Sequence, residues 1–148
     1  MFKLNVFISV WMNIRIHVLN TNVFTSQLFK TWTKWILKGG YGVLRNNHKD
    51  ICDLLITTGA NIFAKTKSDG ATPAHRAAYT GRLNILQLLV DKGGVALLEF
   101  GDGDGRNCLH HAYRGNQQNV ISWILENYPH LSTMADNKGI LPISLAPS

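Results

Sequence analysis

A block that recurs at a nearly constant spacing is the feature that most constrains the fold of this chain. Residues 69–78 and 104–113 share Asp, Gly, His and Ala at corresponding positions, 35 residues apart. Each block is followed by an apolar run. The copies of the apolar run are 51–56, 85–90 and 120–125, and a last copy of the block is 138–146. A unit of this size cannot bury an apolar face alone, so neighbouring units must stack to form a common core.

The residues of the first block resemble the ankyrin-repeat family. Thr72-Pro73-Ala74-His75-Arg76-Ala77-Ala78, followed by Gly81, matches the family signature T-P-L-H-x-A, whose unit is about 33 residues long. Gly59-Ala60-Asn61 is similar to the sequence that ends a second helix in this family. The resemblance covers residues 43–148 and implies an all-α fold, an α-solenoid of stacked helix-turn-helix units with hairpin-like loops. The order of repeats and the short C-terminal ending are most similar to those of a short stand-alone member.

The repeat phase divides the chain into five parts. They are a non-repeat N-terminal segment (1–38), a partial repeat (39–68), two complete repeats (69–103 and 104–137) and a truncated capping repeat (138–148). Within them, we expect helices near 49–57, 73–80, 83–92, 108–114, 118–127 and 142–146. Apolar residues recur at helical spacing in the second helix of each complete unit, which predicts that Leu88 and Leu89 are buried.

Five residues are expected to have structural roles. Pro73 suits the first turn of a helix, because its missing N–H is not needed there, and Thr72 can cap the same end. Gly81 can end this short helix in a left-handed turn. The resemblance implies that the His75 ring bonds the Thr72 hydroxyl and neighbouring backbone, and that His110 takes the same position in the next unit. Asn107-Cys108 replaces Thr-Pro there, so we expect a looser helix start.

Cys108, His110 and His111, together with His75, could suggest a metal or catalytic site. The structural position of His75 and His110 explains them without one, and Asp102–Gly105 lacks the ligands of a calcium loop. We therefore expect no metal, no cofactor and no catalysis. Cys52 and Cys108 form no disulfide framework, and the chain has no N-x-S/T acceptor. These two observations favour an intracellular protein, cytoplasmic or nuclear.

Charge is distributed unevenly along the chain. Residues 1–50 hold seven basic side chains and one acidic side chain, whereas residues 51–148 hold eight of each. A nucleic-acid-binding protein concentrates basic residues on its recognition module. Because the repeats are neutral, we expect no nucleic-acid ligand.

The N-terminal segment does not match the repeat. Apolar residues alternate from Phe2 to Val18, which is typical of a β-strand, and residues 26–39 read as a basic amphipathic helix. The helix could pack on Lys49–Thr57 in place of a missing first helix, or bind a membrane. Alternatively, the segment could be an end unrelated to the ancestral repeat. No apolar stretch is long enough to span a bilayer, so we expect no membrane partner.

Members of the family bind proteins through hairpin tips and the exposed side of the first helices. The resemblance thus implies an interaction module, an adaptor or scaffold that is a monomer with a protein partner. The residues carried over to this surface are Thr66, Ser68, Asp69, Ala71, Tyr79, Thr80, Asp104, Arg106, Arg114, Asn137 and Lys138. The alternative is a membrane-associated adaptor anchored by residues 1–38.

Overall fold

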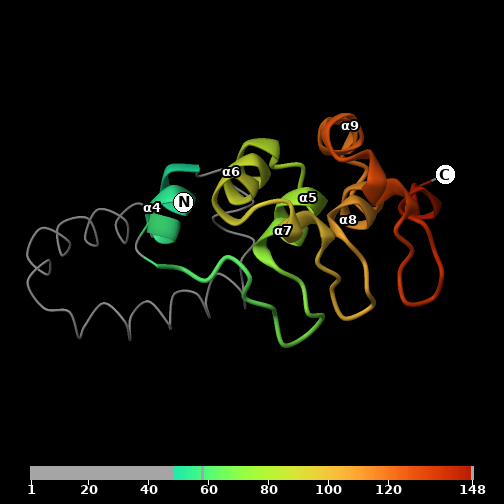
Figure 1. Cartoon of the computed structure of the whole chain (residues 1–148), viewed down its shortest axis with the longest axis horizontal. Coiled ribbons are helices and arrows are strands. Elements are labelled where there is room, and N and C mark those ends of the chain that lie inside the picture. The colour runs from blue at the N-terminus through green and yellow to red at the C-terminus, as the bar shows by residue number, and fades with distance from the viewer. Residues whose placement is uncertain (1–48, 58, 148) are drawn as a thin grey trace, which may run out of the picture. The chain divides into compact units, whose positions relative to one another are not determined.

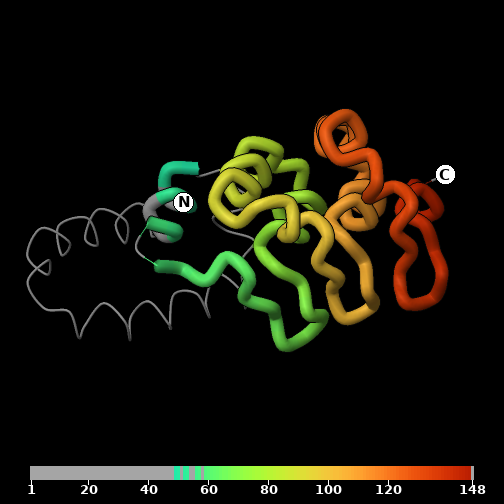
Figure 2. Tube along the Cα trace, in the orientation of Figure 1, coloured from blue at the N-terminus to red at the C-terminus, as the bar shows by residue number. Residues whose placement is uncertain are grey.

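The computed structural model describes residues 49–57 and 59–147 (Figures 1 and 2). The expected N-terminal strand, the amphipathic helix and the question of what replaces the first helix of the partial repeat all lie outside these residues. None of the described helices is both long and apolar enough to cross a bilayer.

The described part is helical, with no strand, and this confirms the all-α solenoid. Five of the expected helices lie within a residue or so of their predicted bounds: α4 (Lys49–Thr57), α5 (Pro73–Tyr79), α6 (Leu83–Gly93), α8 (Cys108–Arg114) and α9 (Gln118–Asn127). The sixth, near 142–146, is a 3-10 helix, η2 (Pro142–Leu145). Its hydrogen bonds span three residues, from the Ser144 N–H to the Leu141 carbonyl at 3.0 Å and from the Ala146 N–H to the Ile143 carbonyl at 3.1 Å, which is the 3-10 pattern.

Two short helices were not predicted. The helix α7 (Ala96–Glu99) follows α6, and the 3-10 helix η1 (Pro129–Thr133) follows α9 at the corresponding place in the next unit. Both are single turns, and a single turn carries too few residues for an apolar period to be visible. Leu97 and Leu98 of α7 and Leu131 of η1 are fully buried and belong to the core.

First helices stack on first helices. α5 lies against α8, and α8 lies against η2. The second helix of the partial repeat, α4, packs on α6. In Figure 1 the loops that precede α5, α8 and η2 all project to the same side of these helices, while α6 and α9 lie on the other side. The units therefore stack in sequence order, as the repeat predicts.

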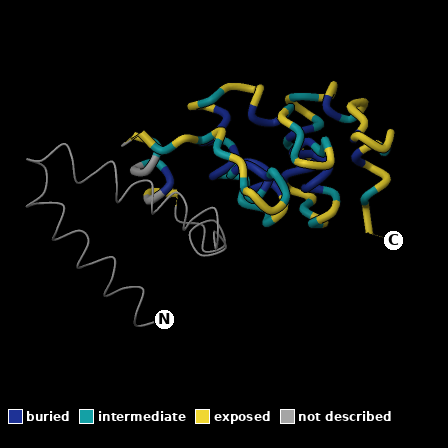
Figure 3. The backbone as a smooth tube through the Cα atoms, turned by 90° about the horizontal axis from the view of Figure 1, so that it is seen from below, coloured by how far each residue is buried: buried dark blue, intermediate teal, exposed yellow. Residues whose placement is uncertain are grey.

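Small side chains allow the first helices to approach closely. Ala74, Ala77 and Ala78 of α5 have no exposed surface, and neither do Leu109 and Ala112 of α8. Figure 3 shows the buried residues gathered in the middle of the described part. Because each helix buries one face against the unit before it and another against the unit after it, the core is continuous along the stack.

Left-handed residues end the first helices at matching places. Gly81 follows α5 with φ +72°, and Asn116 follows α8 with φ +53°. The neighbouring Gly115 is constrained by space instead, since a Cβ there would lie 2.2 Å from the carbonyl oxygen of Tyr79. Glycine at this position lets the end of α8 abut the end of α5.

The expected loose start of α8 is not what the structure has. The Asn107 Oδ1 accepts hydrogen bonds from the backbone N–H groups of Leu109 and His110, at 3.0 and 3.1 Å. Its Nδ2 donates to the carbonyl of Leu131 at 3.3 Å. This cap satisfies donors that a helix end leaves free, and so offsets the absence of proline.

Replacing Leu89 with alanine should lower the free energy of unfolding by about 2–5 kcal/mol, because the leucine is only 3% exposed and its removal leaves a cavity. Urea denaturation followed by circular dichroism measures the loss. Ser122→Ala, on the exposed surface of α9, is the control and should change little. Equal stability of the two variants would mean that α6 is not buried in the stack.

Candidate functional site

Backbone hydrogen bonds join the tips of successive hairpin loops. The N–H of Gly103 donates to the carbonyl of Asp69 at 2.8 Å, and the N–H of Asn137 donates to the carbonyl of Asp104 at 2.9 Å. Gly70 makes the first contact possible, since a Cβ there would lie 2.8 Å from the backbone nitrogen of Gly103. The tips thus form one continuous edge.

An aspartate closes each of the later two loops. The Asp102 Oδ1 accepts from the N–H groups of Asp104 and Arg106, at 2.9 and 3.0 Å. The Asp136 Oδ1 accepts from Lys138 and Ile140, both at 2.9 Å. Asp102 and Asp136 lie 34 residues apart, so the repeat spacing relates the two turns. The carboxylates form turns rather than a calcium loop.

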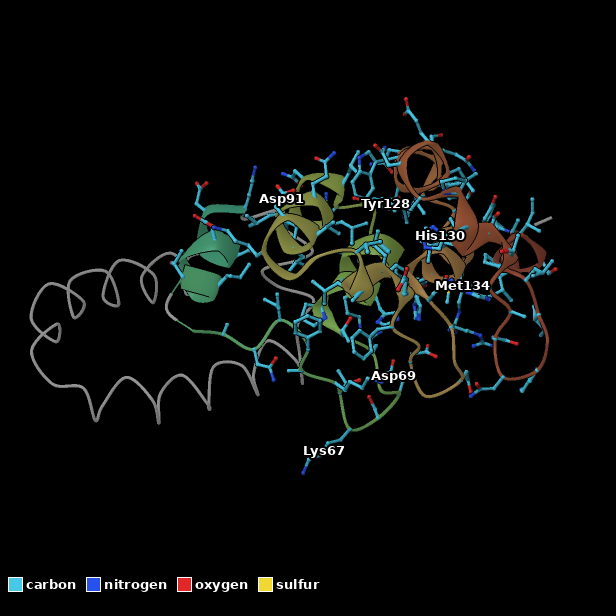
Figure 4. All side chains as sticks on the ribbon, in the orientation of Figure 1. Lys67, Asp69, Asp91, Tyr128, His130 and Met134 are labelled. Atoms are coloured by element: carbon cyan, nitrogen blue, oxygen red, sulfur yellow. The ribbon has the colours of Figure 1, made fainter. Side chains whose placement is uncertain are left out.

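A polar groove of about 510 Å³ lies between the first helices and the hairpin tips of the two complete repeats. Five of the predicted surface residues line it: Ser68, Asp69, Tyr79, Asp104 and Arg114. Figure 4 labels Asp69 on the first of these hairpins, beside Lys67, whose side chain points away from the helices. Tyr79 and Arg114 occupy corresponding positions in the two repeats, 35 residues apart.

The remaining predicted residues lie elsewhere. Thr66, Thr80 and Arg106 are partly buried, and the Thr80 hydroxyl donates to the carbonyl of Arg76 at 2.7 Å. Asn137 and Lys138 are exposed on the last hairpin.

Ala71 was wrongly placed on the binding surface, because none of its surface is exposed. Its N–H donates to the Thr66 hydroxyl at 3.0 Å, and its carbonyl accepts from the N–H of Thr66 at the same distance. These bonds close the hairpin and turn the Ala71 side chain inward.

Three residues that the sequence analysis did not assign to the surface also line the groove: Arg76, Asp102 and His111. The His111 Nε2 lies 2.8 Å from the Asp102 Oδ2, and both side chains are almost fully buried. Arg76 corresponds to His111 in the preceding repeat and bonds Asp69 at 2.5 Å. In both repeats, therefore, the residue after the structural histidine ties the first helix to an acid of the hairpin loop that precedes that helix.

The two structural histidines span the interfaces between units. The His75 Nδ1 accepts from the N–H of Thr72 at 3.0 Å and lies 2.8 Å from the Thr72 hydroxyl. Its Nε2 lies 2.8 and 2.9 Å from the carbonyl oxygens of Phe100 and Arg106, in the next unit's loop. The His110 Nε2 lies 3.0 Å from the carbonyl of Ile140, one unit further on. Their ring nitrogens are therefore engaged with backbone.

Burial dominates the titration of these groups. Burial and the charge of His111 lower the pKa of His75 to about 4, although the carbonyls of Phe100 and Arg106 and the charge of Asp102 oppose the shift. Burial also raises the pKa of the Cys108 thiol, which has no exposed surface. Within the described residues, no three His, Cys, Asp or Glu side chains are placed to hold a metal ion together.

The repeat, its paired histidines and its hairpin edge all correspond to one known architecture. A family model described as ankyrin repeats (3 copies) matches residues 41–135.

The chain belongs to the ankyrin-repeat family.

Ankyrin repeats are protein–protein interaction modules, and the family is generally non-catalytic. Curated relatives share parts of this chain. It is 31% identical over 90 residues to the probable 26S proteasome regulatory subunit p28 of Saccharomyces cerevisiae. The matched residues make up 61% of this chain and 39% of that protein. It is 38% identical over 68 residues to alpha-latrotoxin-Lhe1a of Latrodectus hesperus, covering 46% of this chain and 5% of the toxin.

A third relative is the human transient receptor potential cation channel subfamily A member 1, 39% identical over 64 residues, or 43% of this chain and 6% of the channel. The chain thus spans less than half the length of each of these relatives, and the likeness lies in the repeats.

Acid should destabilise the ankyrin stack through His75. Its pKa is about 4 when folded and about 6.5 when exposed, so the unfolded chain binds the proton first. The contribution is complete above about pH 6.5 and is lost as the pH falls through about 4, a change of about 3 kcal/mol. Burial also lowers the pKa of His111, with the same sign. Urea denaturation at a series of pH values measures the slope.

His75→Gln should flatten this pH dependence, whereas His130→Gln should not, since the His130 side chain is 51% exposed. An unchanged slope in the His75 variant would contradict the assignment.

Proposed function

We propose that this chain is a non-catalytic adaptor or scaffold that binds a protein partner through the hairpin tips and the exposed side of the first helices. The observation that supports this most is the groove between the two complete repeats. Backbone hydrogen bonds join the successive hairpin tips along its edge. Tyr79 and Arg114 contribute an aromatic and a guanidinium group at corresponding positions. Aromatic and arginine side chains are enriched among the residues that dominate binding energy.

The apolar positions support the same assignment. The inward faces of both helices are buried between units, so a partner cannot reach them. The exposed groups near the groove are polar or amphipathic, as at the rim of a non-obligate interface. Ser68, Asp69 and Asp104 would then supply hydrogen-bond acceptors, and Asn137 and Lys138 would extend the surface along the last hairpin.

The proposal extends to the oligomeric state, the compartment and the ligand class of the protein. We propose a monomeric intracellular protein, cytoplasmic or nuclear, that binds no nucleic acid. The order of its repeats suggests a likeness to ankyrin repeat domain-containing protein 39. The membrane-adaptor alternative depends on residues 1–38, outside the described residues. Co-sedimentation with liposomes of the full chain, but not of a chain starting at Gly40, would favour that alternative.

Tyr79→Ala or Arg114→Ala should weaken a partner by about 1–2 kcal/mol without changing the fold. Both residues are exposed and line the groove, so their removal leaves no cavity in the core. The partner is first captured by a pull-down with the full chain, and its affinity for each variant is then measured by calorimetry. Circular dichroism checks folding.

Lys92→Ala is the matched control, because Lys92 is an exposed residue of α6 that does not line the groove. A loss of affinity in this variant, with normal affinity in the other two, would place the binding surface on another side of the stack.

A further inference from the structure

The carboxylates that line the groove are all engaged within the fold. Each carboxylate that lines it has a nitrogen partner. The pairs, with their N···O distances, are Asp69–Arg76 at 2.5 Å, Asp102–His111 at 2.8 Å and Asp104–Arg106 at 2.8 Å. Backbone N–H groups bond Asp102 as well. The acceptor atoms of these carboxylates are thus largely occupied by donors of the fold, while the Asp102–His111 pair keeps a negative charge, because burial lowers the pKa of His111.

The pKa values of these carboxylates agree with that conclusion. Burial alone would raise the pKa of Asp69, but hydrogen bonds from Thr66 and the charge of Arg76 outweigh it and bring the pKa to about 2. For Asp102, hydrogen bonds from the backbone and from His111 likewise outweigh burial and lower the pKa. Both anions are stabilised by donors that are already in place.

Arg114 is the exception. Among the described residues, no hydrogen bond or ion pair engages its guanidinium group, and the residue is exposed at the rim of the groove. The charge of Arg114 nevertheless reaches the floor of the groove. Burial has the largest effect and lowers the pKa of His111. Asp102 raises this pKa, and the charges of Arg76 and Arg114 lower it. The charges of both arginines therefore act on His111, against the opposing charge of Asp102.

Tyr79 provides a neighbouring wall. The close approach of Gly115 to the Tyr79 carbonyl brings the ends of α5 and α8 together. The Tyr79 side chain is 37% exposed and lines the same groove as Arg114. An aromatic face beside an unpaired guanidinium suits a carboxylate, since arginine bonds a carboxylate through two N–H groups.

We propose that this groove selects an acidic peptide segment of the partner and that one of its Asp or Glu carboxylates pairs with Arg114 beside Tyr79. This rests on the function proposed above and adds the chemistry of the ligand. A dense polyanion such as a nucleic acid fits less well, because it would place successive phosphates against the carboxylates of Asp69 and Asp104. A single carboxylate meets the one guanidinium of the groove lining that has no partner among the described residues.

A library of random 12-residue peptides displayed on phage tests the proposal with the full chain as bait. Peptides selected by the wild type should be enriched at least threefold in Asp and Glu over the unselected library. Arg114→Glu should abolish that enrichment or reverse it in favour of Lys and Arg. Lys92→Glu, a charge reversal outside the groove, should select acidic peptides as the wild type does. Circular dichroism confirms that each bait is folded, and Arg114→Gln replaces Arg114→Glu if that variant does not fold.

The affinity of one selected peptide then assigns the contact. Arg114→Gln should weaken it at least tenfold, and replacing the critical Glu of the peptide with Gln should weaken the wild type equally. Combining the two changes should cause no further loss, because both remove the same pair.

The outcomes separate the two proposals. If selected peptides lose affinity for Tyr79→Ala but show no acidic preference, the groove binds peptides and the acidic-segment proposal is overturned. If peptides bind equally to the wild type, Tyr79→Ala and Arg114→Gln, or if none is selected, the groove is not the binding surface and both proposals are overturned.

Discussion

The stack depends on the bridge that a buried histidine makes between units. One nitrogen of the His75 ring bonds the start of its own helix, and the other meets carbonyl oxygens in the loop of the next unit. α5 has only seven residues, too few to be stable alone, and the hairpin loops belong to no sheet. Their backbone groups are satisfied largely because the neighbouring unit is held in register. His110 makes the corresponding contact with Ile140.

The same bridge positions the groove. Because His75 connects α5 to the loop before α8, the acids of that loop lie beside the residues that follow the histidines. Asp102 can then pair with His111, while Asp69 pairs with Arg76 in the preceding repeat. The structural and binding roles are thus divided between adjacent positions of one signature: the histidine joins the units, and the next residue faces the groove.

The repeat pattern predicted the stack, the bounds of most helices and the left-handed turn at Gly81, since each follows from local sequence. Five of the surface residues that the family resemblance implied also line the groove. The pattern did not predict Arg76, Asp102 or His111, because pairing between a helix and a loop depends on a fold in space that spacing alone does not reveal. Ala71 was misplaced for a similar reason. It stands next to exposed hairpin residues in sequence, yet the hydrogen bonds of the turn direct it inward.

The most direct test of the histidine bridge is the tautomer of the His75 ring, measured by long-range ¹H–¹⁵N NMR of the imidazole groups at neutral pH. The Thr72 N–H donates to Nδ1, and carbonyl oxygens face Nε2, so the ring should be neutral with its proton on Nε2. A neutral ring also agrees with a pKa of about 4. A proton on Nδ1, or a charged ring at neutral pH, would contradict the bridge on which this account of the stack depends.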